Sequence, residues 1–215
     1  MSLKPVRMTV TIKLDSTLWP ITLIEFTNSL EKLGFEITEE IPIPRPIGRF
    51  SGLGQIARKG NIVVNVDGGA KAISMYGLSL ESTIEEFDSF IKTLQTDYSV
   101  DLDEFADYYQ FASRYEYKTN EDAYAMISNF FTYPKLDELA KIIDIPIKTF
   151  SIKVGSADAV PNEINWFDIQ FAPDVQRNDG YTIDVVYRNE NKESYRTFIS
   201  HIEEKIVKSI QLLEG

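Results

Sequence analysis

The chain has 215 residues, of which 43% are hydrophobic and 26% are charged, and its formal net charge is −11. This length and composition are typical of a globular protein with a sizeable core. Cysteine is absent and His201 is the one histidine, which excludes disulfides, thiol chemistry and multi-histidine metal sites. We therefore expect neither a metal nor a cofactor.

The composition also bears on where the protein works and what it binds. No apolar run approaches the roughly 18–20 residues of a membrane-spanning helix, and the first residues lack the features of a secretory signal. We expect a cytoplasmic protein, and its abundant Ile and charged residues favour a heat-adapted source. Most of the acidic excess falls in residues 101–215. Because neutralisation of phosphates dominates nucleic-acid affinity, nucleic acid is not an expected partner.

The first half of the chain predicts a strand, a helix, several strands and a longer helix. These segments are residues 7–14, 20–33, 35–75 and 82–95, in that order. Ser16 or Thr17 can cap the first helix, and Gly34 can end it in the left-handed conformation. In the second helix, Ser82 and Glu85 have the spacing of a capping box.

The same order of elements returns in the second half. A strand is expected at 108–118, a helix at 120–131, strands between 148 and 188, and one closing helix at 193–213. A brief extra helix is expected to open at Pro134. Hairpin turns are predicted at Asp67-Gly68-Gly69 and at Asn178-Asp179-Gly180.

Most of the predicted strands alternate between apolar and polar side chains. In the strand at 108–118, Tyr109, Phe111, Tyr115 and Tyr117 share one face. Such alternation is typical of antiparallel strands with one covered and one wet face. The sequence therefore predicts an α+β fold in which two similar strand-helix-strands-helix halves form a curved antiparallel sheet with helices on one face. The halves, 1–100 and 101–215, are expected to pack as one unit.

This order of elements, repeated once over about residues 7–213, resembles in topology the duplicated saddle of the TATA-box-binding protein fold. In that family the open sheet face contacts DNA. Here that face is expected to display Glu116, Asp168 and Asp184 beside Arg114 and Arg188. No residue motif of the family is matched, so no DNA-contacting residue is carried over. An acidic-leaning face argues against the family's function.

The first candidate site is a segment rich in proline, glycine and basic residues. It contains Arg45, Arg49, Arg58 and Lys59, the densest basic cluster of the chain. Glycine turns with arginines can hold an anion through backbone N–H groups and guanidinium contacts. The glycine spacing between residues 48 and 54 is neither a P-loop nor a dinucleotide fingerprint. The alternative is a long connection with solvated arginines.

The second candidate site is the wet face of the sheet, with Arg114, Glu116, Asp168, Asp184 and Arg188. Carboxylates on neighbouring strands can act as acid and base if their surroundings separate their pKa values. Cross-strand ion pairing is the alternative. His201 is interpreted as a surface residue of the closing helix, with a general base as the alternative.

Three functions follow from these observations. The favoured one is a non-catalytic binding or assembly module, which holds an unknown protein or a second copy of itself on the open sheet or on the loop at 41–60. The second is an enzyme or carrier for a small anionic ligand, with Arg45, Arg49 and Arg58 as clamps. The third is a nucleic-acid-associated factor of the TATA-box-binding-protein-like fold. The shortage of catalytic residue types favours the first.

Overall fold

The computed structural model describes residues 2–15, 20, 22–38, 54–130, 134–160, 163–177 and 179–215. The strands are β1 (Ser2–Leu14), β2 (Glu36–Ile37), β3 (Gln55–Lys59), β4 (Ile62–Asp67), β5 (Ala72–Gly77), β6 (Ala106–Lys118), β7 (Ile152–Gly155), β8 (Trp166–Pro173) and β9 (Gly180–Asn189). The helices are α1 (Leu23–Lys32), α2 (Leu80–Tyr98), α3 (Ala123–Phe130), α4 (Pro134–Ile143), α5 (Lys192–Ser200) and α6 (Ile202–Glu214), with a 3₁₀ turn at Leu102–Phe105.

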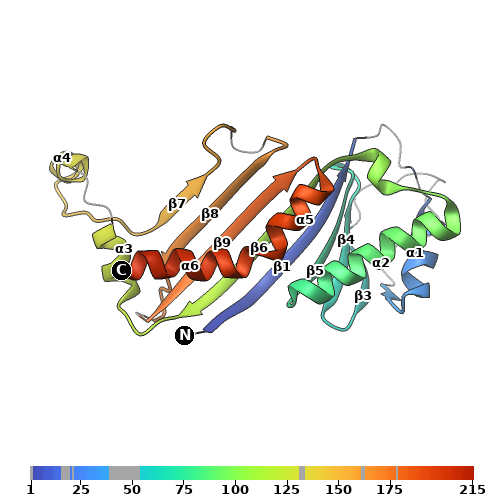
Figure 1. The fold of residues 1–215 in the computed structure, drawn as a ribbon, viewed down its shortest axis with the longest axis horizontal. Coiled ribbons are helices and arrows are strands. Elements are labelled where there is room, and N and C mark those ends of the chain that lie inside the picture. The colour runs from blue at the N-terminus through green and yellow to red at the C-terminus, as the bar shows by residue number, and fades with distance from the viewer. Residues whose placement is uncertain are drawn as a thin grey trace.

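The nine strands form one antiparallel sheet in the order β2-β3-β4-β5-β1-β6-β9-β8-β7. The two longest strands, β1 and β6, pair with each other at its centre (Figure 1). Strands from before residue 100 lie on one side of this central pair, and strands from after it lie on the other. The division into two domains near residue 100 stays a prediction.

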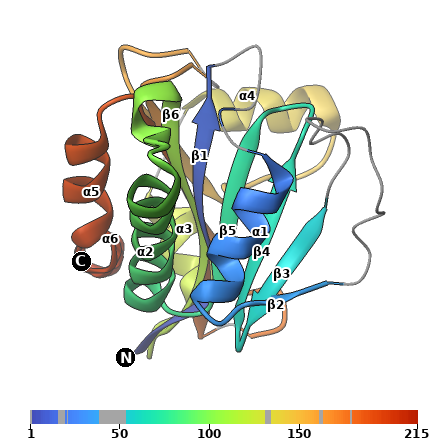
Figure 2. The same ribbon diagram turned by 90° about the vertical axis from the view of Figure 1, so that its right-hand side faces the viewer.

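The helices α2, α5 and α6 lie over one face of the sheet, as the view from the β2 end of the sheet shows (Figure 2). Helix α1 lies beside α2 and β2 at one end, and α3 contacts β8 and α6 at the other. Helix α4 lies beyond β7, outside the outline of the strands (Figure 1). The predicted fold class, an α+β protein with a curved antiparallel sheet and helices on one face, is confirmed.

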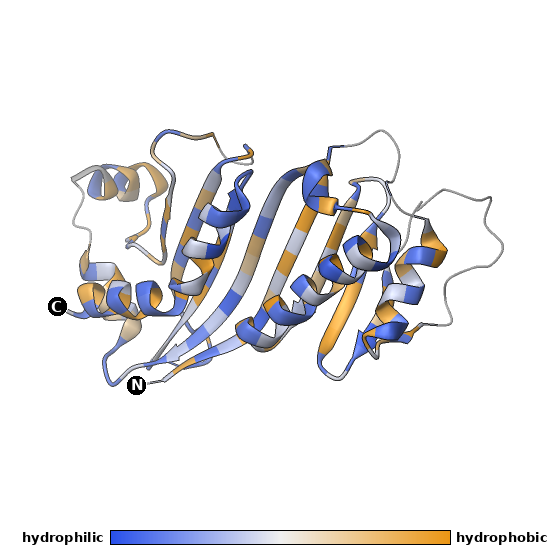
Figure 3. Cartoon of the chain, turned by 45° about the vertical axis from the view of Figure 1, so that its right-hand side comes forward, coloured by the Kyte–Doolittle hydropathy of each residue, from blue (hydrophilic) through white to orange (hydrophobic). Residues whose placement is uncertain are grey.

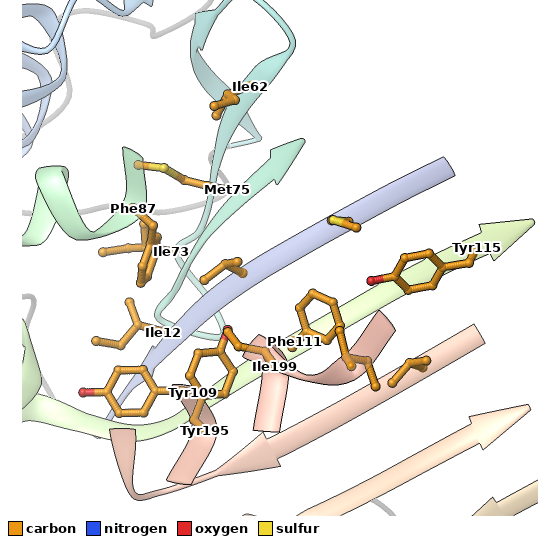
Figure 4. Packing of buried hydrophobic residues seen from close by; sticks show 14 of the residues in the cluster. Ile12, Ile62, Ile73, Met75, Phe87, Tyr109, Phe111, Tyr115, Tyr195 and Ile199 are labelled. Atoms are coloured by element: carbon orange, nitrogen blue, oxygen red, sulfur yellow. The ribbon is translucent and has the colours of Figure 1, made fainter. Parts of the chain in front are cut away.

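The core lies between the helices and the sheet because each element contributes one apolar stripe. Along the strands, hydrophilic and hydrophobic residues alternate (Figure 3). Ile12 of β1, Tyr109 of β6 and Tyr195 of α5 meet in the middle of the core and are 0–3% exposed (Figure 4). The rings of Tyr109 and Tyr195 lie 5.6 Å apart between centroids. The four aromatic residues predicted on one face of β6 are all buried.

Two helix starts differ from the predictions. Helix α1 begins at Leu23, where Thr22 and Glu25 form a capping box; Ser16 and Thr17 lie outside the described residues. Helix α2 begins at Leu80, because the side chain of Ser79 accepts a hydrogen bond from the backbone N–H of Ser82 and caps the helix first. Gly34 does adopt the expected left-handed conformation, with φ of +82°.

The single closing helix predicted at 193–213 is wrong, since the chain forms α5 and α6 with a break at His201. The buried positions of α5 are Tyr195 and Ile199, and those of α6 begin at Ile202. At the break His201 has φ of −114° and ψ of 9°, outside the helical range. The change of direction lets both helices keep their apolar stripes on a curved sheet, which one straight helix could not follow.

Candidate binding face

The face of the sheet opposite the helices, called the open face below, carries the side chains that alternate with the core positions. In the described strands it is formed by Ser2, Lys4, Arg7, Thr9, Thr11 and Lys13 of β1, the even-numbered residues 108–118 of β6, 180–188 of β9 and 166–172 of β8, Lys153 and Gly155 of β7, and the matching positions of β2 to β5. Among the described residues no helix lies over its central strands.

The open face carries more positive than negative side chains, although the whole chain has a net charge of −11. In the described strands its cations are Lys4, Arg7, Lys13, Arg58, Arg114, Lys118, Lys153 and Arg188. Its carboxylates are Glu36, Asp67, Glu116, Asp168 and Asp184. The expectation of an acidic-leaning face, which considered five residues of β6, β8 and β9, is therefore wrong, because β1 and β7 add Lys4, Arg7, Lys13 and Lys153 to the same face.

A groove of about 500 Å³ runs across the centre of the open face. Its lining comes from three neighbouring strands and includes Val6, Arg7 and Thr9 of β1, Ala112 and Arg114 of β6, and Asp184 and Val186 of β9. The groove exists because small side chains, Thr9, Ala112 and Val186, form its floor between longer charged neighbours. It combines a partly apolar floor with two guanidinium groups and one carboxylate.

Two arginines of this groove occupy opposed positions. Arg7 of β1 is the direct cross-strand partner of Arg114 of β6. Arg114 donates from Nε and Nη2 to the two carboxylate oxygens of Asp184 at 2.7 and 2.9 Å. This contact raises the pKa of Arg114 above its ordinary value. Arg7 lies over the ring of Tyr76, 4.8 Å from its centroid, and no described carboxylate lies within ion-pair distance of it.

Arg188 belongs to a separate cluster at the end of β6 and β9. Its guanidinium lies 5.0 Å from the ring centroid of Tyr108 and 6.0 Å from that of Trp166. Its Nε donates to Oε1 of Gln110 at 2.5 Å. The two aromatic rings hold this guanidinium at the surface of the sheet through cation–π contacts.

The other predicted carboxylates of the open face are ion-paired. Asp168 of β8 is 6% exposed, and Nζ of Lys153 on β7 lies 3.1 Å from its carboxylate. Glu116 of β6 lies 3.5 Å from Arg177. The five residues predicted for this site thus lie on one face of three neighbouring strands, β6, β9 and β8. The cross-strand pairing that was the alternative interpretation accounts for Arg114, Asp168 and Asp184; a binding role for these residues stays a prediction.

The basic cluster predicted for residues 45–59 is divided. Arg58 lies on the open face, where its Nε donates to the backbone oxygen of Gly60 at 2.9 Å. Lys59 points to the helix side and pairs with Glu86 of α2 at 2.5 Å. The alternation of side chains along β3 separates these two neighbours. Arg45 and Arg49 lie outside the described residues.

His201 is exposed at the junction of α5 and α6, as predicted for a surface residue. Its Nδ1 lies 2.8 Å from Oγ of Ser200 and 3.1 Å from the backbone oxygen of Thr197. In the described ranges, no three His, Asp or Glu side chains gather as metal ligands would. Nor does any helix in those ranges combine the length and apolar character needed to cross a bilayer.

The sequence did not single out Arg7, Tyr76 or Trp166 as site residues, whereas Val186 was expected to be an exposed residue of the sheet. Arg7 lies on the polar face of the first predicted strand, but only the pairing of β1 with β6 shows that it lies opposite Arg114.

No protein-family model matches this chain. No curated protein matches its sequence either.

Proposed function

We propose that this protein is a non-catalytic binding module that holds a partner on its open face. The observation that supports the proposal is the uneven covering of the sheet. Helices lie over one face, whereas the other displays a groove between β1, β6 and β9 with charged walls and a partly apolar floor. Concave surfaces that combine apolar area with a few placed polar groups are typical of binding sites.

The arrangement of the carboxylates favours binding over acid–base catalysis. Asp184 accepts hydrogen bonds from Nε and Nη2 of Arg114, and Asp168 is buried and ion-paired with Lys153. A catalytic pair needs two titrating groups directed at one reacting position, and these two carboxylates are instead engaged by separate cations.

The resemblance of the element order to the duplicated TATA-box-binding protein saddle also supports a role for the open face, because that family binds its partner there. A shared origin of the two halves, a cytoplasmic location and a heat-adapted source stay predictions.

The proposal is tested by placing a charge on the floor of the groove. The variant Val186→Glu puts a carboxylate there, and the control Leu212→Glu puts one on α6, where the side chain is 72% exposed. Each immobilised protein is exposed to an extract of the cells of origin, and bound proteins are identified by mass spectrometry. Circular dichroism checks that both variants are folded.

We expect the wild type and Leu212→Glu to retain the same partner and Val186→Glu to lose it. Equal retention by all three proteins contradicts a binding role for the open face. A concentration series by light scattering shows whether the partner is a second copy of the chain.

A further inference from the structure

We propose that the groove binds an acidic segment of a partner protein, with one carboxylate side chain of that segment held between Arg7 and Arg114. This inference rests on the proposed function of the open face and names the chemistry of the partner. It starts from the pairing of Arg7 with Arg114 across β1 and β6. Like charges directly opposite each other on neighbouring strands are destabilising, so an anion bound between the two arginines would offset their repulsion.

Within the described residues, a carboxylate of the protein neutralises only one of the two arginines. Asp184 occupies two donors of Arg114, Nε and Nη2. Arg7 receives no carboxylate from the described residues, and Tyr76 holds its guanidinium over an aromatic ring at 4.8 Å. A guanidinium that is positioned by a ring and has donors to spare is suited to bidentate contact with a carboxylate.

Charge on the rest of the open face favours an acidic partner. Lys4, the next residue of β1 on the open face, is exposed and faces Glu116, and the strands of this face carry more cations than carboxylates. The surface of the helix layer has the opposite character, since α2 carries Glu81, Glu85, Glu86, Asp88 and Asp97 against Lys92. Complementary potentials of this kind steer association and fix the orientation of a partner.

The shape of the groove favours a polypeptide over a small metabolite. Small-molecule sites bury most of their ligand, whereas this groove lies across the surface of a sheet and is lined by residues of three neighbouring strands. Its floor includes Ala112 and Val186, which suit apolar side chains next to the carboxylate. An acidic segment with interspersed apolar residues matches both features.

The same face disfavours nucleic acid. A nucleic-acid strand presents one phosphate at every nucleotide and gains affinity from the neutralisation of several of them. Asp184 lies inside the groove, and Glu116 and Asp168 lie on the flanking positions of β6 and β8. A continuous phosphate backbone would meet these carboxylates, whereas a peptide can place its carboxylates only where arginines lie.

The test uses a fluorescein-labelled peptide of alternating Glu and Val, with a Gln–Val peptide and a single-stranded oligonucleotide of equal length as comparisons. Binding to the full chain is followed by fluorescence anisotropy at about 50 mM salt, where exposed charges are only partly screened. The variants are Arg7→Gln, Arg7→Lys, and the control Lys208→Gln. Lys208 is an exposed lysine of α6 in an ion pair with Glu204, so its variant removes the same charge from the helix layer.

We expect Arg7→Gln to weaken binding of the Glu–Val peptide by about tenfold or more, because a charge-assisted bidentate contact is lost. Arg7→Lys keeps the charge without the planar fork and should recover part of the affinity. The control Lys208→Gln should change the affinity by less than about twofold, because Lys208 lies on the helix side of the sheet and its charge is screened from the groove by salt. The Gln–Val peptide should bind more weakly than the Glu–Val peptide.

Three results would overturn the inference: no binding of the Glu–Val peptide, equal binding by the wild type and Arg7→Gln, or tighter binding of the oligonucleotide than of the peptide. If partner capture still depends on Val186 in any of these cases, only the acidic-segment inference fails. If capture is indifferent to Val186→Glu, the proposed function itself fails.

Discussion

Arg7 and Arg114 face each other across the two central strands, and Arg114 is the one of the pair that holds a carboxylate of the described residues. We expect this pair to cost stability in the unbound protein, because two cations lie at directly opposed positions.

The first prediction concerns this cost. Raising NaCl from about 20 mM to about 500 mM should stabilise the wild type by about 0.5 kcal/mol more than Arg7→Gln, because salt screens a repulsion that the variant lacks. Urea unfolding curves at the two salt concentrations measure the difference. An identical salt response in the two proteins would show that the arginines do not repel.

A second prediction concerns the core under α6. Ile210 is fully buried and Leu212, two residues further on, is 72% exposed. Ile210→Ala should lower the free energy of unfolding by about 2–4 kcal/mol, because it removes buried methyl groups and leaves a cavity. Leu212→Ala should change it by less than about 0.5 kcal/mol. Similar losses for both variants would mean that α6 does not pack as described.

The third prediction concerns the contact between the end of β5 and helix α2. A Cβ atom added to Gly77 would lie 2.0 Å from Oγ1 of Thr83, whose hydroxyl donates to the backbone oxygen of Ser79 at 2.6 Å. Gly77→Ala should therefore destabilise the protein by about 2 kcal/mol, as overpacking of a core does.

The matching double variant separates this clash from other effects. Thr83→Ala removes the hydroxyl that the new methyl group would strike. Gly77→Ala combined with Thr83→Ala should therefore be less destabilised than the sum of the two single variants, by about 1 kcal/mol in a double-mutant cycle. Strict additivity would place the cost of Gly77→Ala elsewhere.

A fourth prediction concerns acid unfolding. Asp174 begins the connection from β8 to β9, where its carboxylate accepts hydrogen bonds from the backbone N–H of Gln176 at 2.9 Å and from Arg177 at 2.8 and 3.0 Å. The backbone contact with Gln176, together with Arg177, lowers the pKa of Asp174 below its ordinary value. A group with a lowered folded-state pKa stabilises the protein above its unfolded pKa and loses that contribution as the pH falls through the folded value.

The wild type should accordingly lose more stability than Asp174→Asn between about pH 6 and about pH 3, because the asparagine variant has no proton to bind. Near neutral pH the variant should be less stable by about 1 kcal/mol, owing to weaker hydrogen bonds. Asp158→Asn, at an exposed loop position, serves as the control. A pH profile of Asp174→Asn parallel to that of the wild type would contradict the assignment.

The alternation of apolar and polar residues made much of the fold predictable. It indicates the buried face of β6 through Tyr109, Phe111, Tyr115 and Tyr117 without knowledge of any neighbour, because the pleat of a strand sends successive side chains to opposite faces. The hairpin at Asp67-Gly68-Gly69 follows for the same local reason, since its turn residues permit a tight reversal. Helix starts were less predictable, because Ser79 and Ser82 offer competing caps and only one is used.

The sequence by itself thus determined the class of fold, the buried side of the strands that alternate clearly, such as β6, and the absence of cysteine chemistry, because all of these depend on residue types and on their spacing along the chain. The order of the strands, and with it the meeting of Arg7 with Arg114, was decided only by the tertiary structure. Strand order brings together residues more than 100 positions apart, and no local pattern records which edge of one strand pairs with which edge of another. The charge of the open face is a sum over that arrangement, so it became visible only once the sheet was assembled.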